Sequence, residues 1–385
     1  MAPDADDAVI GLVLASAAWI GTWGTAPVRA DDGRSFQGDT LREVAHVSIG
    51  GSQVRVRFTN RFGDAPLVIG GAAIAIESAA AAPASGTERR LTFMGMRSVT
   101  VPPHADAYSD PVTLGIPAQS NLLVDLYLPG PAAAATEHTL AYQTNYYASG
   151  DRVGDESARP FTFTYDSWYF LGGIDVSGSP ARGALVALGD SITDGAGGKK
   201  NANDRWTDFL AARLLSLPAN QQFGVLDEGI SGNRILLSDT RFGANALARL
   251  DADVLSQSGA AVVMVLLGIN DIQQEPHQYD PVRIEQGLQQ IVLQAHARGL
   301  RVIGCTITPY EGWLFYDRKG EAARLAVNEF IRKGGTFDAV ADFDAAMRDP
   351  RDPHRLLPAY DSGDHLHPNA AGHRVMADAI DLRTL

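Results

Sequence analysis

An apolar run of strand length, residues 184–188, ends abruptly at the small polar turn Gly189-Asp190-Ser191. Four further apolar runs follow it, at residues 224–227, 261–267, 301–307 and 339–343. Nearly continuous apolar strands that alternate with amphipathic helices predict a parallel sheet with helices on both faces. Because ligands of such sheets bind at the carboxyl ends of the strands, we expect Ser191 at an open edge rather than in the core.

Two of the segments between these runs carry apolar side chains at helical spacing. The apolar positions are Trp206, Phe209, Leu210 and Leu214 in the first segment, and Ile284, Leu288, Ile291, Val292 and Ala295 in the second. A further helix is expected at residues 369–380, next to the C-terminus.

Residues 19–178 show a different pattern, of short alternating strands separated by turn-forming residues. The runs 44–49 and 53–58 flank Gly50 and Gly51 and predict a β-hairpin. Further strands are expected at 67–76, 90–93, 121–128, 139–143 and 169–176. Such a series predicts an all-β sandwich of jelly-roll-like type.

The pattern changes at Ser177-Gly178-Ser179-Pro180, which is typical of an interdomain linker. The chain has 385 residues, more than one hydrophobic core usually supports. We therefore expect a flexible tail or remnant signal segment at 1–18, the β-sandwich at 19–178 and an α/β domain at 183–385.

Charge and cysteine content limit the possible partners. The net charge of −13 argues against nucleic acid and against anionic membrane surfaces, and it suits neutral substrates. The single cysteine, Cys305, lies in an apolar run and is expected to be a buried thiol.

The N-terminus supports two interpretations. Residues 9–18 are apolar over the length of a signal-peptide core, but Asp4, Asp6 and Asp7 stand where such a signal carries positive charge. The run is an export signal of a secreted or periplasmic protein, or it is a tail of a cytoplasmic one. It is too short to span a bilayer, and no other segment is apolar enough to do so.

Ser191 becomes a strong nucleophile only if a base accepts its proton. His367 can serve as that base, and Asp364, three residues earlier, can hold the imidazole in the right tautomer. Pro368 and Asn369 open a helix directly after His367 and would anchor this turn.

Acyl transfer also requires hydrogen-bond donors for the developing oxyanion. The turn Ser231-Gly232-Asn233 can present the backbone N–H of Gly232, and Asn270 can present its side-chain amide. The backbone N–H of Ser191 is the third candidate. Each donor follows a successive strand, so all three are expected at one edge of the sheet.

These blocks resemble, in order and spacing, those of the SGNH (GDSL-type) hydrolase superfamily. Gly-Asp-Ser matches the first block at Ser191, Gly232 the second, Gly-x-Asn-Asp the third at Asn270, and Asp-x-x-His the fifth at Asp364 and His367. The resemblance covers residues 183–385. It implies a flavodoxin-like three-layer α/β/α fold and ester hydrolysis through an acyl-enzyme.

Two further stretches, 18–23 and 356–369, resemble a bacterial subgroup that carries an N-terminal β-sandwich and is often exported. The resemblance does not define the substrate, because the superfamily includes carbohydrate deacetylases, arylesterases, lipases and lysophospholipases.

Other patterns carry less weight. His354, His365, His367 and His373 with Asp364 could bind zinc, but His367 already has a role. The sequence has neither a G-x-G-x-x-G dinucleotide motif after a strand nor a G-x-S-x-G nucleophile elbow. The segment 310–313 is either a pocket wall or a packed loop, and Trp168-Tyr169-Phe170 is expected in a core or an interface.

The sequence thus predicts a serine carboxylester hydrolase that acts on small-molecule or glycan esters of short acyl chains. It requires no cofactor and no metal, and it has no nucleic-acid partner and no membrane insertion. The segments 195–205 and 271–281 are polar, as a shallow site for short chains would be. The alternatives are a carbohydrate O-deacetylase whose β-domain holds a glycan, and a non-catalytic binding protein that has kept the fold.

Overall fold

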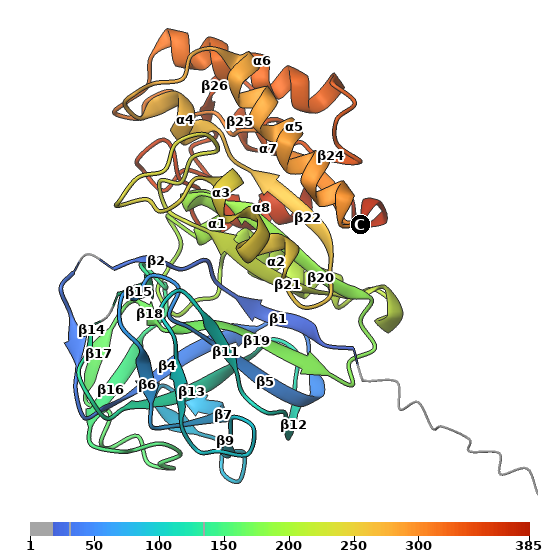
Figure 1. Ribbon diagram of the computed structural model, residues 1–385. Helices are drawn as coiled ribbons and strands as arrows, with labels where there is room; N and C mark the ends of the chain where they lie inside the picture. The colour runs from blue at the N-terminus through green and yellow to red at the C-terminus, as the bar shows by residue number, and fades with distance from the viewer. Residues whose placement is uncertain (1–17, 31, 134) are drawn as a thin grey trace, which may run out of the picture.

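Residues 20–177 form two antiparallel sheets that share one apolar core (Figure 1). The computed structural model describes residues 18–30, 32–133 and 135–385, so nearly all of the apolar run 9–18 lies outside it. One sheet contains β1 (Ile20–Gly24), β5 (Gly51–Thr59), β11 (Asp106–Tyr108), β12 (Val112–Ile116) and β19 (Leu171–Ser177). The other contains β4 (Asp39–Val47), β7 (Gly71–Ala79), β8 (Ala82–Pro83), β9 (Arg89–Leu91), β13 (Ser120–Leu128), β16 (Asn145–Ser149) and β17 (Phe163–Tyr165).

Short strands close the sandwich at its rims. They are β2 (Val28–Arg29), β3 (Ser35–Phe36), β6 (Leu67–Ile69), β10 (Val99–Val101), β14 (Ala132–Ala133), β15 (Thr136–His138) and β18 (Trp168–Tyr169). We call residues 20–177 the β-region below. The side chains of Trp168, Tyr169 and Phe170 are buried in it, which confirms the expectation of a core position.

The predicted hairpin of residues 44–49 and 53–58 is wrong. β4 pairs with β13 and β16, whereas β5 pairs with β19, β11 and β12 in the opposite sheet. The link between them crosses from sheet to sheet, and a Cβ on Gly50 would lie 2.3 Å from the Ile116 carbonyl oxygen. Apolar side chains of both strands meet across the sandwich, which a flat hairpin would not allow. The strand expected at 139–143 is also absent, and those residues lie in turns and coil.

From residue 183 onward the chain forms a parallel sheet in the strand order β21-β20-β22-β23-β24. Numbered along the chain this order is 2-1-3-4-5, which is the flavodoxin-like arrangement. The strands are β20 (Gly183–Gly189), β21 (Phe223–Gly229), β22 (Ala260–Leu266), β23 (Arg301–Cys305) and β24 (Ala339–Ala341), with a small hairpin of β25 (Arg348–Asp349) and β26 (Asp352–Leu356). All five expected strands are confirmed, with small shifts at their ends. Cys305 is buried in β23.

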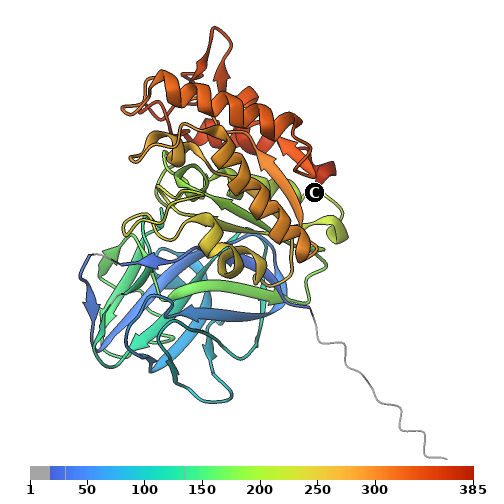
Figure 2. The ribbon, with the colours of Figure 1, turned by 45° about the horizontal axis from the view of Figure 1, so that its top comes forward.

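Helices cover both faces of this sheet and complete three layers. On one face lie α3 (Ala246–Leu250), α5 (Pro281–Ala297) and α6 (Arg318–Lys333), of which α5 and α6 are neighbours (Figure 2). On the other face lie α2 (Trp206–Leu214), α7 (Phe343–Met347) and α8 (Ala370–Asp378). The short helices α1 (Ser191–Asp194) and α4 (Ile269–Gln273) begin where β20 and β22 end.

The β-region replaces a helix over the edge strand β21. Strand β1 packs on β21, and Ile20 and Trp23 belong to the same apolar cluster as Leu226. The approach is close because glycines face each other, and a Cβ on Gly224 would lie 2.0 Å from the Gly21 carbonyl oxygen. One apolar core therefore continues from the sandwich into the α/β layers.

Gly224→Ala is expected to destabilise the protein by about 1–3 kcal/mol, because the new methyl group meets backbone that cannot move alone. The measurement is the midpoint of urea unfolding. Gly115→Ala is the matched control, since its Cβ would meet nothing within 4 Å. Equal midpoints for the two variants would contradict the close packing of β1 on β21.

A buried histidine in α8 makes stability depend on pH. The side chain of His373 is fully buried, and its Nε2 lies 3.2 Å from the Ala196 carbonyl oxygen while its Nδ1 has no partner among the described residues. Burial is the main reason that the pKa of His373 is lowered to about 4. At a pH between about 4 and 6.5, His373 is therefore protonated in the unfolded chain but neutral in the folded protein.

The free energy of unfolding should therefore fall as the pH drops from 6.5 to 4, by on the order of 3 kcal/mol from this residue alone. His373→Gln removes the titration and keeps a donor for the Ala196 carbonyl, so its stability should fall less over the same window. Urea unfolding of both proteins at pH 7, 6, 5 and 4 measures the difference. Parallel losses would show that His373 is protonated in the folded state.

Candidate active site

Ser191 is the first residue of α1, directly after the carboxyl end of β20. Asp190 caps this short helix, because its Oδ1 accepts the N–H of Ile192 at 3.0 Å. Burial raises the pKa of Asp190 to about 7. Gly195 ends the helix with a φ of 106°, a value that favours glycine. The serine is thus held in a tight turn by backbone contacts.

The structure brings Asp364, His367 and Ser191 together in one hydrogen-bonded row. The Oγ of Ser191 lies 2.9 Å from Nε2 of His367, and Nδ1 of His367 lies 2.6 Å from Oδ2 of Asp364. Because the carboxylate only accepts, Nδ1 carries the proton and Nε2 is free to accept from the serine hydroxyl.

The surroundings of Asp364 favour its charged form. Burial opposes its ionisation, but the imidazole of His367 and the backbone N–H groups of His367 and Leu366 donate to it. Together they hold the pKa of Asp364 well below its usual range.

The turn that carries these two residues is anchored at both ends. A bridge joins Asp361 to Pro368, and Asn369 caps α8 through the N–H groups of Ala371 and Gly372. The amide of Asn369 also donates to the Asp361 carbonyl at 3.0 Å. This confirms that Pro368 and Asn369 fix the turn at the start of a helix.

The two predicted oxyanion donors lie on neighbouring loops. Gly232 has a φ of 79°, and a Cβ there would lie 2.3 Å from the ring of Phe242, so the position requires glycine. Asn270 is 3% exposed, and its Nδ2 donates to the Asn233 carbonyl at 3.1 Å. Among the described residues this leaves the second amide hydrogen of Asn270 for a ligand.

Three further side chains, which the sequence analysis did not assign to the site, hold the two predicted donors in place. Gln273 and Gln274 donate from Nε2 to Oδ1 of Asn270, at 2.8 and 2.9 Å, and so define which way its amide points. Asp271 accepts the N–H groups of Ile235 and Leu236, at 2.8 and 3.0 Å, and ties the loop after β21 to the loop after β22. Burial raises the pKa of Asp271 to about 6.

The segment 310–313 is divided between the core and the site, because Tyr310 is buried and Trp313 lies beside His367. The indole of Trp313 meets the ring of His367 edge to face, with centroids 5.8 Å apart. Its Nε1 donates to Oε1 of Gln273 at 2.8 Å, so Trp313 contacts His367 and also supports the side chain that bonds to Asn270. The next two residues, Leu314 and Phe315, are 81% and 53% exposed and continue an apolar rim.

The histidines considered for zinc have separate partners. His354 bonds to Glu321, His365 to Asp361, His367 to Asp364, and His373 to a backbone carbonyl. Within the described ranges, no three histidine, cysteine or carboxylate side chains form a group that could hold a metal ion. No helix in that same part of the chain is both long and apolar enough to span a membrane.

Residues 187–375 match the GDSL-like lipase/acylhydrolase family. No curated protein matches the chain. Similar solved structures include a protein assigned to the G-D-S-L family of lipolytic proteins from Desulfitobacterium hafniense DCB-2, with 21% identity, a TM-score of 0.41, and coverage of 52% of this chain and 99% of that one.

Two others are a GDSL-like lipase from Bacteroides thetaiotaomicron VPI-5482 and an aryl esterase from M. smegmatis. The first has 20% identity and a TM-score of 0.39, and covers 52% of this chain and 87% of its own. The second has 19% identity and a TM-score of 0.41, and covers 51% and 95%. The family match rests on the segment that carries every residue of the site described above. Residues 187–375 are therefore a domain of the GDSL-like lipase/acylhydrolase family, and the protein is a carboxylesterase.

Proposed function

We propose that this protein hydrolyses carboxylic esters of short acyl chains through an acyl-enzyme on Ser191. His367 is the general base and Asp364 orients it. The backbone N–H groups of Ser191 and Gly232 and the amide of Asn270 form the oxyanion hole. The observation that carries the proposal is the row from Asp364 through His367 to the Ser191 hydroxyl, at 2.6 and 2.9 Å.

In the first half of the reaction the Ser191 Oγ attacks the ester carbonyl while its proton passes to Nε2 of His367. The resulting imidazolium is stabilised by the Asp364 carboxylate. The carbonyl oxygen becomes an oxyanion and receives hydrogen bonds from the three donors, which are held before the reaction begins. When the intermediate collapses, the alcohol leaves with the proton from His367.

In the second half a water molecule attacks the acyl-serine. His367, again neutral, accepts a proton from that water, and the same donors stabilise the second oxyanion. Collapse releases the carboxylic acid and returns the proton to Ser191.

The preference for short acyl chains rests on the polarity of the loops around the serine. Gln273 and Gln274 lie beside Asn270, and the segments 195–205 and 271–281 are polar. The apolar rim of Trp313, Leu314 and Phe315 is small for a surface that must meet a lipid phase. In the β-region, the buried Trp168, Tyr169 and Phe170 are not placed to hold a glycan.

The test is kcat/KM for p-nitrophenyl esters from acetate to palmitate. The rate should be highest for acyl chains of about two to six carbons, because a site at the open edge of such a sheet is a shallow crevice. A maximum at twelve carbons or more, or a jump above the micelle threshold, would contradict the short-chain assignment. Acetylated xylan, assayed alongside, shows whether a glycan ester is the better substrate.

Ser191→Ala is the control for that series. It should keep the fold and lower turnover by about 10⁶-fold, as loss of a triad nucleophile does. Near-normal activity of the folded variant would overturn the assignment of the nucleophile.

Asn270→Ala should lower kcat about 10²- to 10³-fold with little change in KM, because its amide acts mainly on the transition state. Gln222→Ala is a suitable control, since the side-chain amide of Gln222 donates to the Leu215 and Leu217 carbonyls, in the loop after α2. If KM rises while kcat holds, Asn270 binds the ground state of the substrate instead.

A further inference from the structure

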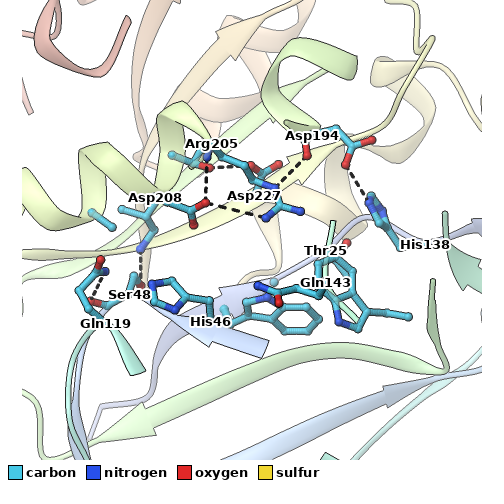
Figure 3. A pocket seen from close by; sticks show the side chains of 16 residues that line it. Thr25, His46, Ser48, Gln119, His138, Gln143, Asp194, Arg205, Asp208 and Asp227 are labelled. Carbon is cyan, nitrogen blue, oxygen red and sulfur yellow. Dashed lines mark hydrogen bonds and ion pairs between the residues drawn. The ribbon is translucent and has the colours of Figure 1, made fainter. Parts of the chain in front are cut away.

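Behind the serine, a buried side chain of the β-region meets a buried side chain of α1. Nε2 of His138, at the end of β15, lies 3.0 Å from Oδ1 of Asp194. Their side chains are only 5% and 2% exposed. Figure 3 shows this pair at one end of a cavity that both parts of the chain line.

The hydrogen bonds determine the charge of this pair. Nδ1 of His138 lies 2.8 Å from the Ala26 carbonyl oxygen, which can only accept, and Nε2 faces the Asp194 carboxylate. Both ring nitrogens therefore donate, and His138 is an imidazolium paired with a carboxylate. Burial alone would lower the pKa of His138, but the charge and hydrogen bond of Asp194 outweigh it and raise that pKa.

The second carboxylate oxygen of Asp194 bonds to the loop after β21, which carries Gly232. Its Oδ2 accepts the hydroxyl of Ser231 at 2.7 Å and the backbone N–H of Ser231 at 3.2 Å. Ser231 immediately precedes Gly232. Asp194 is also the last residue of α1, the helix that begins with Ser191. It therefore connects the helix of Ser191 with the loop that carries Gly232.

The main chain of Asp194 is also connected to the β-region, through Arg205 at the start of α2. Nε of Arg205 donates to the Asp194 carbonyl at 2.8 Å, and Nη2 of Arg205 donates to the Ala141 carbonyl at 2.7 Å. Asp194 is therefore held by both regions of the chain, and the row His138–Asp194–Ser231 links the β-region to the loop that carries Gly232.

We propose that His138 is a positioning residue for ester hydrolysis, which completes the active site from the β-region. Through Asp194 it fixes the Ser231–Gly232 turn so that the Gly232 N–H points to the oxyanion. The inference rests on the proposed function, and it assigns to the β-region a part in the reaction rather than only in folding.

The two nitrogens of His138 allow a matched pair of variants. In His138→Gln the amide nitrogen stands near the place of Nε2 and can still donate to Asp194. In His138→Asn it stands near the place of Nδ1 and can donate only to the Ala26 carbonyl. Both variants remove the same charge, so a merely structural role would affect them alike.

The experiment measures kcat and KM with p-nitrophenyl acetate, per serine titrated by a fluorophosphonate, so that unfolded protein is not counted. His138→Asn should lower kcat about 10- to 100-fold with KM within twofold, because a misplaced donor acts on the transition state. His138→Gln should recover most of kcat. Ser258→Ala, which removes a contact with Arg55 of the β-region at the amino end of β22, should match the wild type.

Ser231→Ala gives an independent measurement, because it removes the 2.7 Å bond to Asp194 without leaving a buried charge unpaired. It should lower kcat several-fold at constant KM. If His138→Asn does not fold, this variant alone tests whether the row from His138 to Ser231 has a positioning role. Equal kcat for the Gln and Asn variants, or wild-type kcat for Ser231→Ala, would overturn the positioning role. A wild-type protein that neither hydrolyses the ester nor reacts with the fluorophosphonate would instead overturn the proposed function, and this inference with it.

Discussion

The hydrogen bond between Ser191 and His367 joins two residues that lie 176 positions apart in the chain. The parallel sheet and its helices bring the end of β20 and the turn before α8 to the same edge of the sheet. The flavodoxin-like order places β20 between β21 and β22, so the loops that carry Gly232 and Asn270 lie on either side of the serine. A parallel sheet has all its carboxyl ends at one edge, and this explains why residues from three strands meet there.

Three carboxylates hold these loops in place, and two of them, Asp190 and Asp271, are buried. Asp190 caps the serine helix, Asp271 accepts two N–H groups of the loop after β21, and Asp364 accepts two N–H groups of its own turn. Each uses oxygens that can accept several bonds at once, which a neutral side chain cannot match. Desolvation raises the pKa of Asp190 and Asp271, whereas the imidazole keeps the pKa of Asp364 low. Of these three carboxylates, only the one that pairs with His367 has its pKa lowered.

The sequence predicted the elements that have a strong local signal. Continuous apolar runs identified the five parallel strands, and the predicted site residues Ser191, Gly232 and Asn270 follow three of these strands in the structure. It missed α6, whose apolar stripe is short, at Ala323, Val327 and Ile331, and is interrupted by the buried Arg324 and Asn328, which bond to the Ile307 carbonyl. The hairpin of β4 and β5 was wrong because pairing across a sandwich depends on distant strands. His138 could not be found, since nothing local marks a histidine whose partner lies 56 residues away.

A second polar network shows why the β-region and the reacting edge form one unit. Arg249 of α3 donates to the Gly189 and Glu228 carbonyls, at 2.9 and 2.8 Å, and so clamps the ends of β20 and β21. Its side chain is only 4% exposed, and an isolated charge at such a depth would be strongly unfavourable. Asp253 balances it at 3.1 Å, and Arg61, which follows β5, pairs in turn with Asp253. Asp253 thus pairs with one arginine from each side of the boundary. Removal of the β-region would take away Arg61 and weaken the contacts by which Asp253 and Arg249 hold the two strand ends. Through Asp253 and Arg249, the sandwich therefore helps to hold the strand ends on which Ser191 and Gly232 follow.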